Sequence, residues 1–284
     1  MSKVCVIRCH YFRDSRLQRE VSALLDRGHS VHVLCLRDGS EPLRERRDRL
    51  VISRMPMSHS AGAGIVRRLG EYMAFFVWAA LTVAALHLRR RFDVVQVNSV
   101  PDFLVFAALV PRFAGARVVL DLQEPMPEFF MTKTGVAERH WTVRGLIAVE
   151  QASIRFADSV LTVTELMRQA FVARGAAPEK ITVVMDGSDE GLFDATRFPR
   201  RMRDNGKFVL LSHGTIEPQY GLDTAIRAVA LLATEIPSIE LRIVGDGSQR
   251  AELRDLASSL GVSERIVFSS GFLPIDELVA DRIG

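Results

Sequence analysis

Two segments about two hundred residues apart share one layout: Lys3-Val-Cys-Val-Ile-Arg-Cys-His-Tyr-Phe-Arg-Asp-Ser-Arg16 and Phe208-Val-Leu-Leu-Ser-His-Gly-Thr-Ile-Glu-Pro-Gln-Tyr-Gly221. Each is an apolar strand pattern that gives way to small and polar residues just before a helix pattern starts. Each also opens a run of alternating strand and helix patterns, which is typical of doubly wound α/β domains. The sequence therefore predicts an α/β protein built from two such halves that face a shared cleft.

The strand patterns divide the chain into two unequal domains. Six buried strands are expected in the first half, at residues 4–8, 31–36, 94–97, 118–120, 160–163 and 181–184. Three more are expected in the second half, at residues 208–212, 240–244 and 265–269, with the start of a further helix at Ile275. We predict a first domain over residues 1–190, a linker over 191–206 and a second domain over 207–284. Because three βα units make about half of a doubly wound domain, we expect the second domain to be incomplete.

Composition limits the classes of partner. The chain has 284 residues, 48% apolar and 25% charged, and 37 basic against 34 acidic residues give a net charge of +3. This surplus is too small to indicate a nucleic-acid partner. Arginines nevertheless cluster in the first half, at positions 44–49, 67–68 and 89–91. They indicate either an anionic partner on that side or a solvated basic face.

Three cysteines, Cys5, Cys9 and Cys35, fall in predicted core strands. An odd number of buried thiols is typical of a reducing compartment. The first residues enter a strand directly, without the layout of a signal peptide. We therefore expect a protein in the cytoplasm or on the cytoplasmic face of a membrane. No metal site is expected.

Residues 72–88, YMAFFVWAALTVAALHL, carry no formal charge and are bracketed by arginines. The run is shorter than the roughly 20 apolar residues of a membrane-spanning helix, and Trp78 sits in its middle instead of at an end. Three interpretations remain open: a helix buried on the sheet, a helix dipped into an anionic leaflet, or a span. Peripheral contact with an anionic membrane would use the region from Arg67 to Arg91.

Polar residues follow two of the predicted strands. After the first, Arg13 and Arg16 can fork onto a phosphate or carboxylate, while Asp14 or Ser15 can cap the next helix. After the strand at 118–120, Asp121, Glu124 and Glu128 can orient sugar hydroxyls or handle a proton. Ligands bind at the carboxyl ends of strands in open α/β sheets, so these loops are candidate sites; helix capping is the alternative.

Glycines mark the strand ends of the second half. Gly214, Gly221, Gly245 and Gly247 suit close approach of a ligand's phosphates, although ordinary turns use glycine too. The run Val244-Gly-Asp-Gly lacks the full G-x-G-x-x-G/A pattern and comes late in the chain, which disfavours a dinucleotide-binding fingerprint.

Seven motifs in a fixed order carry a family resemblance. They are Tyr11-Phe-Arg-Asp14, Gly28-His-Ser-Val31, Asp93-Val-Val95 followed by Pro101-Asp-Phe103, Asp121-Leu with Pro125-Met-Pro-Glu128, Asp158-Ser-Val-Leu-Thr-Val-Thr-Glu165, His213-Gly-Thr215 with Tyr220-Gly-Leu222, and Arg242-Ile-Val-Gly-Asp-Gly247. Together they resemble the family 4 glycosyltransferases, enzymes of the GT-B fold with two Rossmann-like domains. The resemblance runs over nearly the whole chain.

The resemblance implies metal-independent sugar transfer with retention, from a UDP- or GDP-linked donor to a glycan or lipid-linked acceptor, with no further cofactor. It implies that the second domain holds the donor and the first the acceptor. The residues it assigns are Gln123 and Glu124 for catalysis, Gly214, Thr215, Tyr220, Gly221, Gly245, Phe272 and Leu273 for the donor, and His10, Tyr11, Arg13, Arg16 and Glu128 for the acceptor.

Three departures from the family pattern bear on activity. Many relatives carry Arg and Lys where this chain has Thr215 and Tyr220, and a histidine where it has Gln123. Glutamine does not titrate, so only hydrogen bonding remains at that position. The glutamate pair spaced E-x(7)-E, which holds the donor sugar in relatives, would lie beyond Gly284. We therefore expect an incomplete donor site in these 284 residues.

Three functions are compatible with these observations. The first is a glycosyltransferase of cell-surface polysaccharide or glycolipid assembly. The second is a non-catalytic protein of GT-B descent that binds a membrane or a partner, which Gln123 favours. The third is a GT-B nucleotide-sugar epimerase. The arginine clusters and the apolar run of the first half disfavour it, because such an epimerase has little use for a membrane-binding surface.

Overall fold

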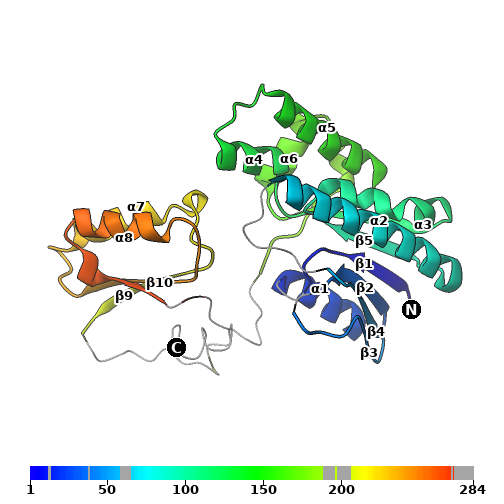
Figure 1. Cartoon of the computed structure of the whole chain (residues 1–284), viewed down its shortest axis with the longest axis horizontal. Coiled ribbons are helices and arrows are strands. Elements are labelled where there is room, and N and C mark those ends of the chain that lie inside the picture. The colour runs from blue at the N-terminus through cyan, green and yellow to red at the C-terminus, as the bar shows by residue number, and fades with distance from the viewer. Residues whose placement is uncertain are drawn as a thin grey trace. The chain divides into compact units, whose positions relative to one another are not determined.

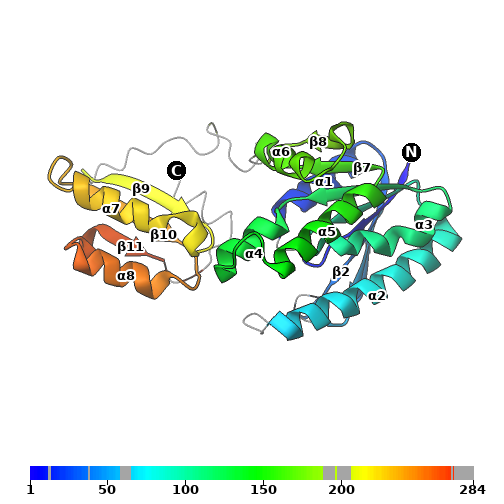
Figure 2. The ribbon, with the colours of Figure 1, turned by 90° about the horizontal axis from the view of Figure 1, so that it is seen from above.

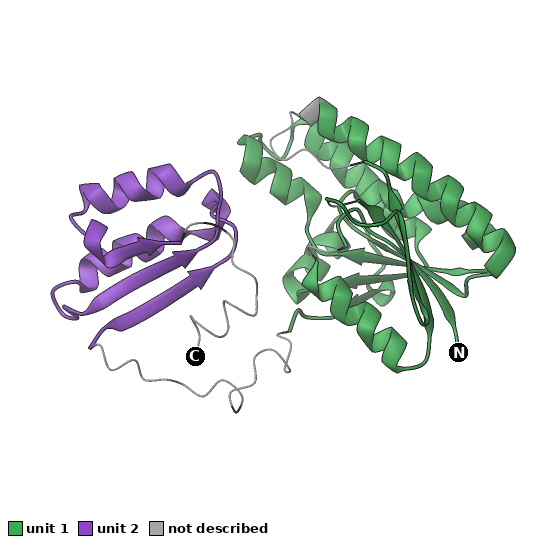
Figure 3. Ribbon diagram, turned by 60° about the horizontal axis from the view of Figure 1, so that its bottom comes forward, with its two compact units in different colours: residues 1–187 green, residues 188–284 purple. Residues whose placement is uncertain are grey.

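The computed structural model describes residues 1–11, 14–37, 39–57, 65–187, 196, 206–269 and 271. Contacts within the chain divide it into two compact units, Met1–Gly187 and Ser188–Gly284 (Figure 3). Each unit is an α/β sandwich with a parallel sheet of its own. The shared cleft expected from the sequence stays a prediction.

The N-terminal unit contains an eight-stranded sheet in the order β3-β4-β2-β1-β5-β6-β7-β8 (Figures 1 and 2). The strands are β1 Lys3–Ile7, β2 Ser30–Leu36, β3 Arg44–Arg47, β4 Leu50–Met55, β5 Val94–Asn98, β6 Arg117–Leu122, β7 Ser159–Thr162 and β8 Ile181–Val183. All neighbours are parallel except β3 and β4. From β1 the chain continues to β2 on one side and later to β5 on the other, so the strand order reverses beside β1. This reversal is where α/β sheets place their ligands.

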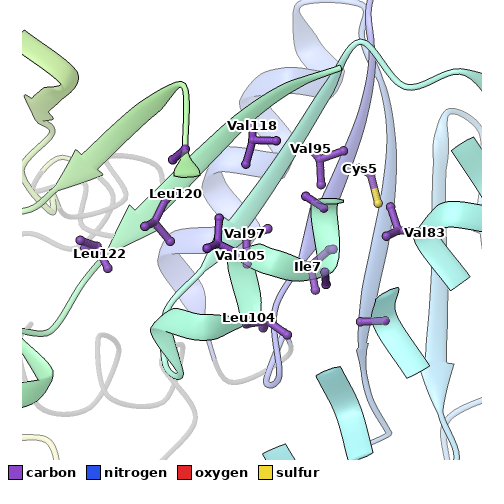
Figure 4. Close-up of a cluster of buried hydrophobic side chains, with 14 of the residues drawn as sticks. Cys5, Ile7, Val83, Val95, Val97, Leu104, Val105, Val118, Leu120 and Leu122 are labelled. Carbon is purple, nitrogen blue, oxygen red and sulfur yellow. The ribbon is translucent and has the colours of Figure 1, made fainter. Parts of the chain in front are cut away.

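Helices connect these strands. They are α1 Ser15–Asp26, α2 Ile65–Arg90, η1 Asp102–Ala108, α3 Leu109–Phe113, α4 Met126–Thr134, α5 Trp141–Phe156, α6 Glu165–Ala173 and η2 Pro178–Lys180. The main core lies between the sheet and the layer that contains α2 and η1; Figure 4 shows Val83 of α2 beside Cys5, and Leu104 and Val105 of η1 beside Val97. The thiols of Cys5, Cys9 and Cys35 are free and buried.

The six strands predicted for the first half are confirmed, but the sequence analysis missed the β3–β4 hairpin. Part of the arginine cluster at positions 44–49 forms β3, which pairs Arg44 with Ser53 and Arg47 with Leu50 of β4. Its Glu45 accepts a hydrogen bond from the buried Arg54 at 2.7 Å, and this contact lowers the pKa of Glu45. An edge strand that carries charged residues lacks the apolar alternation by which strands are recognised, which explains the omission of β3. Strand β4 begins with the apolar run Leu50-Val-Ile52, a signal that was available in the sequence.

Helix α2 is longer than the predicted apolar run and has two different faces. Phe75, Ala79, Val83 and His87 recur every four residues and are buried on the sheet. By length and composition alone, residues Arg67–Arg90 also suffice to cross a membrane, with a mean hydropathy of 1.6 over their most apolar window. Only 17% of that window is buried. The helix is therefore part of the core along one face and apolar yet exposed along the other.

The C-terminal unit contains a three-stranded parallel sheet in the order β11-β10-β9. Its elements are β9 Phe208–His213, η3 Pro218–Tyr220, α7 Leu222–Leu232, β10 Ile239–Val244, α8 Arg250–Ser259, η4 Ser263–Arg265 and β11 Ile266–Phe268. Helices α7 and α8 lie side by side on one face of the sheet (Figure 1), over a core that includes Ile226, Ile243 and Leu253. All three predicted strands are confirmed. The helix predicted at Ile275 lies outside the described residues.

The two faces of α2 predict opposite responses to truncation. Phe75→Ala removes a fully buried ring from the core and should lower the free energy of unfolding by about 3–5 kcal/mol. Leu81→Ala alters a side chain that is 69% exposed and should change it by less than about 0.5 kcal/mol. Urea titration followed by tryptophan fluorescence measures this unit alone, because both tryptophans, Trp78 and Trp141, belong to it. Equal losses would contradict the assignment of the faces.

Candidate functional site

A network of polar side chains lies at the carboxyl ends of β1, β5 and β6. Arg8 follows β1, Asn98 ends β5 and is followed by Ser99, and Asp121 lies near the end of β6. Parallel strands end at one edge of their sheet, so these three loops converge beside the strand-order reversal. Helix α1 begins at the same edge, because the Asp14 side chain caps it by accepting a hydrogen bond from the Leu17 backbone at 3.0 Å.

Asp121 is the fully buried centre of this network. Its Oδ2 accepts hydrogen bonds from Asn98 at 2.6 Å and from the Gln123 amide at 3.0 Å. Its Oδ1 lies 3.2 Å from the Arg16 guanidinium. Burial raises the pKa of Asp121 above its ordinary value, while Arg16 and Gln123 oppose that shift. A buried carboxylate with three donors from separate elements fixes the positions of all three.

Arg16 connects α1 to the loop after β8. Its Nε lies 3.0 Å from Glu20 and 3.0 Å from Asp186. Glu20 in turn accepts a hydrogen bond from Gln96 of β5 at 2.8 Å. Burial, and then the Asp121 charge, raise the pKa of Glu20. The Nη1 of Arg16 is buried without a hydrogen-bond partner, which leaves its N–H groups for an anionic ligand.

The amide of Gln123 has a defined orientation. Its nitrogen donates to Asp121, its oxygen accepts from Arg8 at 3.3 Å, and its backbone N–H donates to Ser99 Oγ at 3.2 Å. The Arg8 guanidinium also lies 3.1 Å from Asp14. Position 123 therefore presents an oriented, non-titrating amide.

Two cavities open beside this network. One, of about 310 Å³, is lined by Arg8, His10, Asp14, Ser15, Arg16, Gln123 and Asp186. The other, of about 190 Å³, is lined by Arg8, Cys9, His10, Tyr72, Ser99, Val100, Gln123 and Glu124. Arg8, His10 and Gln123 line both. The structure thus brings together four predicted site residues, His10, Arg16, Gln123 and Glu124.

Other predicted acceptor residues lie elsewhere. Tyr11 is 6% exposed, packs in a core cluster with Val6 and Leu17, and lines neither cavity. Glu128 of α4 forms an ion pair with Arg174 at 2.5 Å and also lines neither cavity. Arg13 lies outside the described residues. Contact of these three residues with an acceptor stays a prediction.

Sequence reasoning assigned no role to Arg8, Asn98, Ser99 or Asp186, all of which take part in the network or its cavities. A usable signal was present for three of them. A cation directly after the buried β1 and the polar pair Asn98-Ser99 directly after β5 follow the rule that already selected Asp121. Asp186 follows an edge strand, and only the packing of α1 against its loop shows its proximity to Arg16.

In the C-terminal unit, the predicted donor residues gather at the carboxyl ends of β9 and β10. Gly214 has φ of 134°, and Gly245 has φ of 148°. A Cβ added to Gly245 would lie 1.8 Å from the Gly214 carbonyl oxygen, so the two backbones touch. Gly221 has φ of 66° and is the N-cap of α7, while Thr215 and Tyr220 are exposed beside it. Phe272 and Leu273 lie outside the described residues.

A cavity of about 610 Å³ lies at the other edge of the C-terminal sheet. Lys207, Ile239 and Arg265 line it, at the amino ends of the three strands. Ligands of open α/β sheets bind at carboxyl ends, so size does not identify the donor site here. Among the described residues, no three His, Cys, Asp or Glu side chains form a group that could hold a metal ion.

Comparison with known families decides the classification. Residues 14–187 match the model of the glycosyl transferase 4-like domain, and residues 194–281 match the model of glycosyl transferases group 1. The chain belongs to the family 4-like glycosyltransferases. The resemblance in its motifs and its fold class are thereby confirmed.

Curated relatives of this glycosyltransferase align over part of their length. It is 35% identical over 141 residues to the 2-deoxystreptamine glucosyltransferase of Streptomyces kanamyceticus, covering 47% of this chain and 36% of the relative. It is 29% identical over 177 residues to the GDP-mannose-dependent α-(1-6)-phosphatidylinositol monomannoside mannosyltransferase of Mycolicibacterium smegmatis, covering 58% of this chain and 46% of the relative. The matched segments thus span less than half of either curated relative.

Solved structures share the fold over nearly the whole chain. Sucrose-phosphate synthase of Thermosynechococcus elongatus matches with a TM-score of 0.70 at 16% identity, over 99% of this chain and 73% of that one. Anabaena HepE in complex with UDP-glucose matches with a TM-score of 0.64 at 18% identity, over 97% of this chain and 70% of that one.

The ion pair of Glu128 belongs to a buried cluster with a measurable pH dependence. Arg174 also binds the fully buried Glu150 at 2.6 Å, and burial, with Glu150 nearby, raises the pKa of Asp102 from 3.8 to about 7. Between these pH values the folded unit keeps a proton that the unfolded chain releases, so stability falls as pH rises from about 4 to about 7. Asp102→Asn should remove up to about 4 kcal/mol of this fall. Urea midpoints of the parent protein and the variant at pH 5, 6 and 8 measure this fall. The same decrease of stability with pH in both proteins would contradict the raised pKa of Asp102.

The close approach of β9 and β10 yields a second prediction. Gly245→Ala should destabilise the C-terminal unit by at least about 3 kcal/mol, because the new methyl group meets the Gly214 carbonyl. Gly261→Ala is the matched control: its φ of 69° is also positive, but nothing lies within 4 Å of the added Cβ, so about 1 kcal/mol is expected. Hydrogen exchange of the β9 and β10 amides reports the difference.

Proposed function

We propose that this protein transfers a hexose from a UDP- or GDP-linked donor to a hydroxyl of a glycan or lipid-linked acceptor, with retention of anomeric configuration and without a metal ion. Family membership supports sugar transfer. The relatives' names supply the donor and acceptor classes, a glucosyl transfer in one case and a GDP-mannose donor with a phosphatidylinositol-based acceptor in the other. The HepE complex contains UDP-glucose.

The observation that carries the proposal is the oriented Gln123 amide at the edge of two cavities. Arg8 and Asp121 bind its two ends, so it is positioned before any ligand arrives. A pre-oriented amide stabilises a reacting hydroxyl or an anionic transition state at little reorganisation cost. The Glu124 carboxyl, which lines the smaller cavity, is available to accept a hydrogen bond from a sugar hydroxyl.

On the donor side, we assign the diphosphate to the loop that follows β9. Gly214 allows a backbone approach that a side chain would block, and Gly221 places the start of α7 next to it. Backbone N–H groups at a helix start favour phosphate oxygens. Thr215 and Tyr220 offer hydroxyl donors in place of the cations of many relatives.

We further propose that the protein works in the cytoplasm, peripherally bound to the inner face of the plasma membrane in an assembly pathway for polysaccharide or glycolipid. The partly exposed apolar helix α2, with arginines at both ends, supports this placement.

A non-catalytic binding protein is the second candidate. The specific observation in its favour is Gln123 itself, because an amide cannot act as an acid or base. Such a protein would bind membranes or nucleotides and turn over no donor.

The test is a transfer assay with the complete reading frame, UDP-glucose or GDP-mannose, and either a phosphatidylinositol-based or an aminocyclitol acceptor. Gln123→Ala should lower kcat by about a hundredfold with a small change in donor KM, because the amide acts on the reacting groups. Arg139→Gln changes an exposed arginine of the segment between α4 and α5 that lines neither cavity, and it should leave kcat and KM unchanged. NMR of the product gives its anomeric configuration. Transfer that continues at the same rate in the presence of EDTA would support a metal-independent reaction.

Turnover without any acceptor would favour an epimerase. An absence of turnover with every donor, together with nucleotide-independent vesicle binding, would favour the non-catalytic candidate.

A further inference from the structure

A cationic cavity lies at the edge of the N-terminal sheet opposite the candidate site. It has a volume of about 280 Å³ and forms where β1, β2 and β4 begin and α2 ends. Lys3, Arg49, Arg89 and Arg90 are among its lining residues, which include no carboxylate. A helix C-terminus favours cations within its last turn, which accounts for Arg89 and Arg90 of α2. It does not account for Lys3 and Arg49, which come from other elements.

Few carboxylates neutralise these cations. Arg49 lies 3.4 Å from Asp48, whose side chain is 86% exposed, so solvent screens that pair. The Lys3 ammonium donates to the Arg90 carbonyl at 3.0 Å, which caps α2 without cancelling any charge. The carboxylate of Asp93 accepts from the Lys3 backbone N–H at 2.6 Å. Within the described part of the chain, no ion pair is recorded for Arg89 or Arg90.

One residue that lines the cavity, His32, has a buried ring nitrogen without a hydrogen-bond partner. His32 is 3% exposed; its Nε2 lies 2.9 Å from Ser53 Oγ, and its Nδ1 has no hydrogen-bond partner. Burial, followed by the charges of Arg90 and Arg44, lowers the pKa of His32 to about 4, so the ring is neutral at pH 7. When the Ser53 hydroxyl donates to Nε2, Nδ1 carries the ring proton. In that tautomer the buried Nδ1–H of His32 can donate to an anionic oxygen held by the four cations.

The exposed apolar face of α2 runs toward this cavity. Leu69, Met73, Val77, Leu81 and Leu88 are between 44% and 74% exposed. The adjacent helix α3 adds exposed Leu109, Val110 and Phe113 (Figures 1 and 2). From Leu69 to Leu88 the face is about 28 Å long at 1.5 Å per residue. The one acid in α2, Glu71, is buried beside Arg67 at 3.3 Å, so the exposed face carries no negative charge.

We propose that the cavity formed by Lys3, Arg49, Arg89, Arg90 and His32 binds the phosphate of an anionic phospholipid headgroup while the exposed face of α2 lies among the acyl chains. This proposal rests on the peripheral membrane binding in the proposed function and specifies which lipid group the protein contacts. A continuous apolar face that ends in a cationic hollow matches the two parts of such a lipid. Free phosphate would occupy the cavity but would leave the exposed apolar face of α2 in contact with water.

Matched charge variants of the 284-residue chain test the cavity. Arg49→Gln/Arg90→Gln removes two arginines that line it, and Arg46→Gln/Arg91→Gln removes two exposed arginines nearby that do not. On vesicles of phosphatidylglycerol and phosphatidylcholine, the first pair should weaken binding about tenfold more than the second, because it loses direct phosphate contacts as well as long-range attraction. Vesicles of phosphatidylcholine alone should bind neither variant nor the parent protein.

Side-chain NMR signals of His32 give a second readout. Short-chain phosphatidylglycerol, kept below its micelle concentration, should shift them at concentrations where inorganic phosphate does not. An equal shift with inorganic phosphate would reassign the cavity to free phosphate and overturn the lipid assignment. Equal weakening by the two double variants, or no preference of the parent protein for anionic vesicles, would also overturn it. The assays contain no nucleotide sugar, so a failure of sugar transfer is distinguishable from a failure of lipid binding.

Discussion

The N-terminal site depends on one buried charge. The Asp121 carboxylate receives Arg16 from α1, Asn98 from β5 and Gln123 from the loop after β6. Taking a carboxylate out of water is costly unless it is paired and hydrogen-bonded, so the three donors are held as firmly as the charge itself. Through Gln123 this arrangement extends to Arg8 and both cavities. The orientation of the site is thus a consequence of satisfying one buried group.

The two edges of the N-terminal sheet have different electrostatic characters. At the carboxyl edge, cations are matched by carboxylates: Arg16 by Glu20, Asp121 and Asp186, and Arg8 by Asp14. At the amino edge, Lys3, Arg49, Arg89 and Arg90 surround a hollow with no carboxylate in its lining. A balanced edge is suited to sugars, which bind through oriented hydrogen bonds, whereas an unbalanced one is suited to an anion.

The order of elements and their type were predictable because apolar periodicity and glycine positions are local signals. Nine strands were predicted and found, and β3 and β4 were missed. A charged edge strand such as β3 gives no apolar signal, whereas the apolar run Leu50-Val-Ile52 of β4 was an available signal. His10, Arg16, Gln123 and Glu124, which were predicted as site residues, line the two cavities because the ends of parallel strands meet at one edge; their roles in binding and catalysis stay predictions. Their hydrogen-bond and ion-pair partners could not be predicted, because Asp186 is distant from Arg16 in the chain and Arg8 is distant from Gln123.

The amino-acid sequence therefore specified the parallel α/β class, the two-part organisation, the family and the loops that carry polar groups. The fold class and the polar loops follow from patterns a few residues long, and the family follows from the order of seven such motifs along the chain. Three features appear only in the folded chain. Arg174 pairs with Glu128, and the Gln123 amide is hydrogen-bonded between Arg8 and Asp121. His32, whose Nδ1 has no partner, lines a cavity with four cations. Each of these features involves side chains from separate helices, strands or loops. Their distances and orientations are determined by packing and not by spacing along the chain.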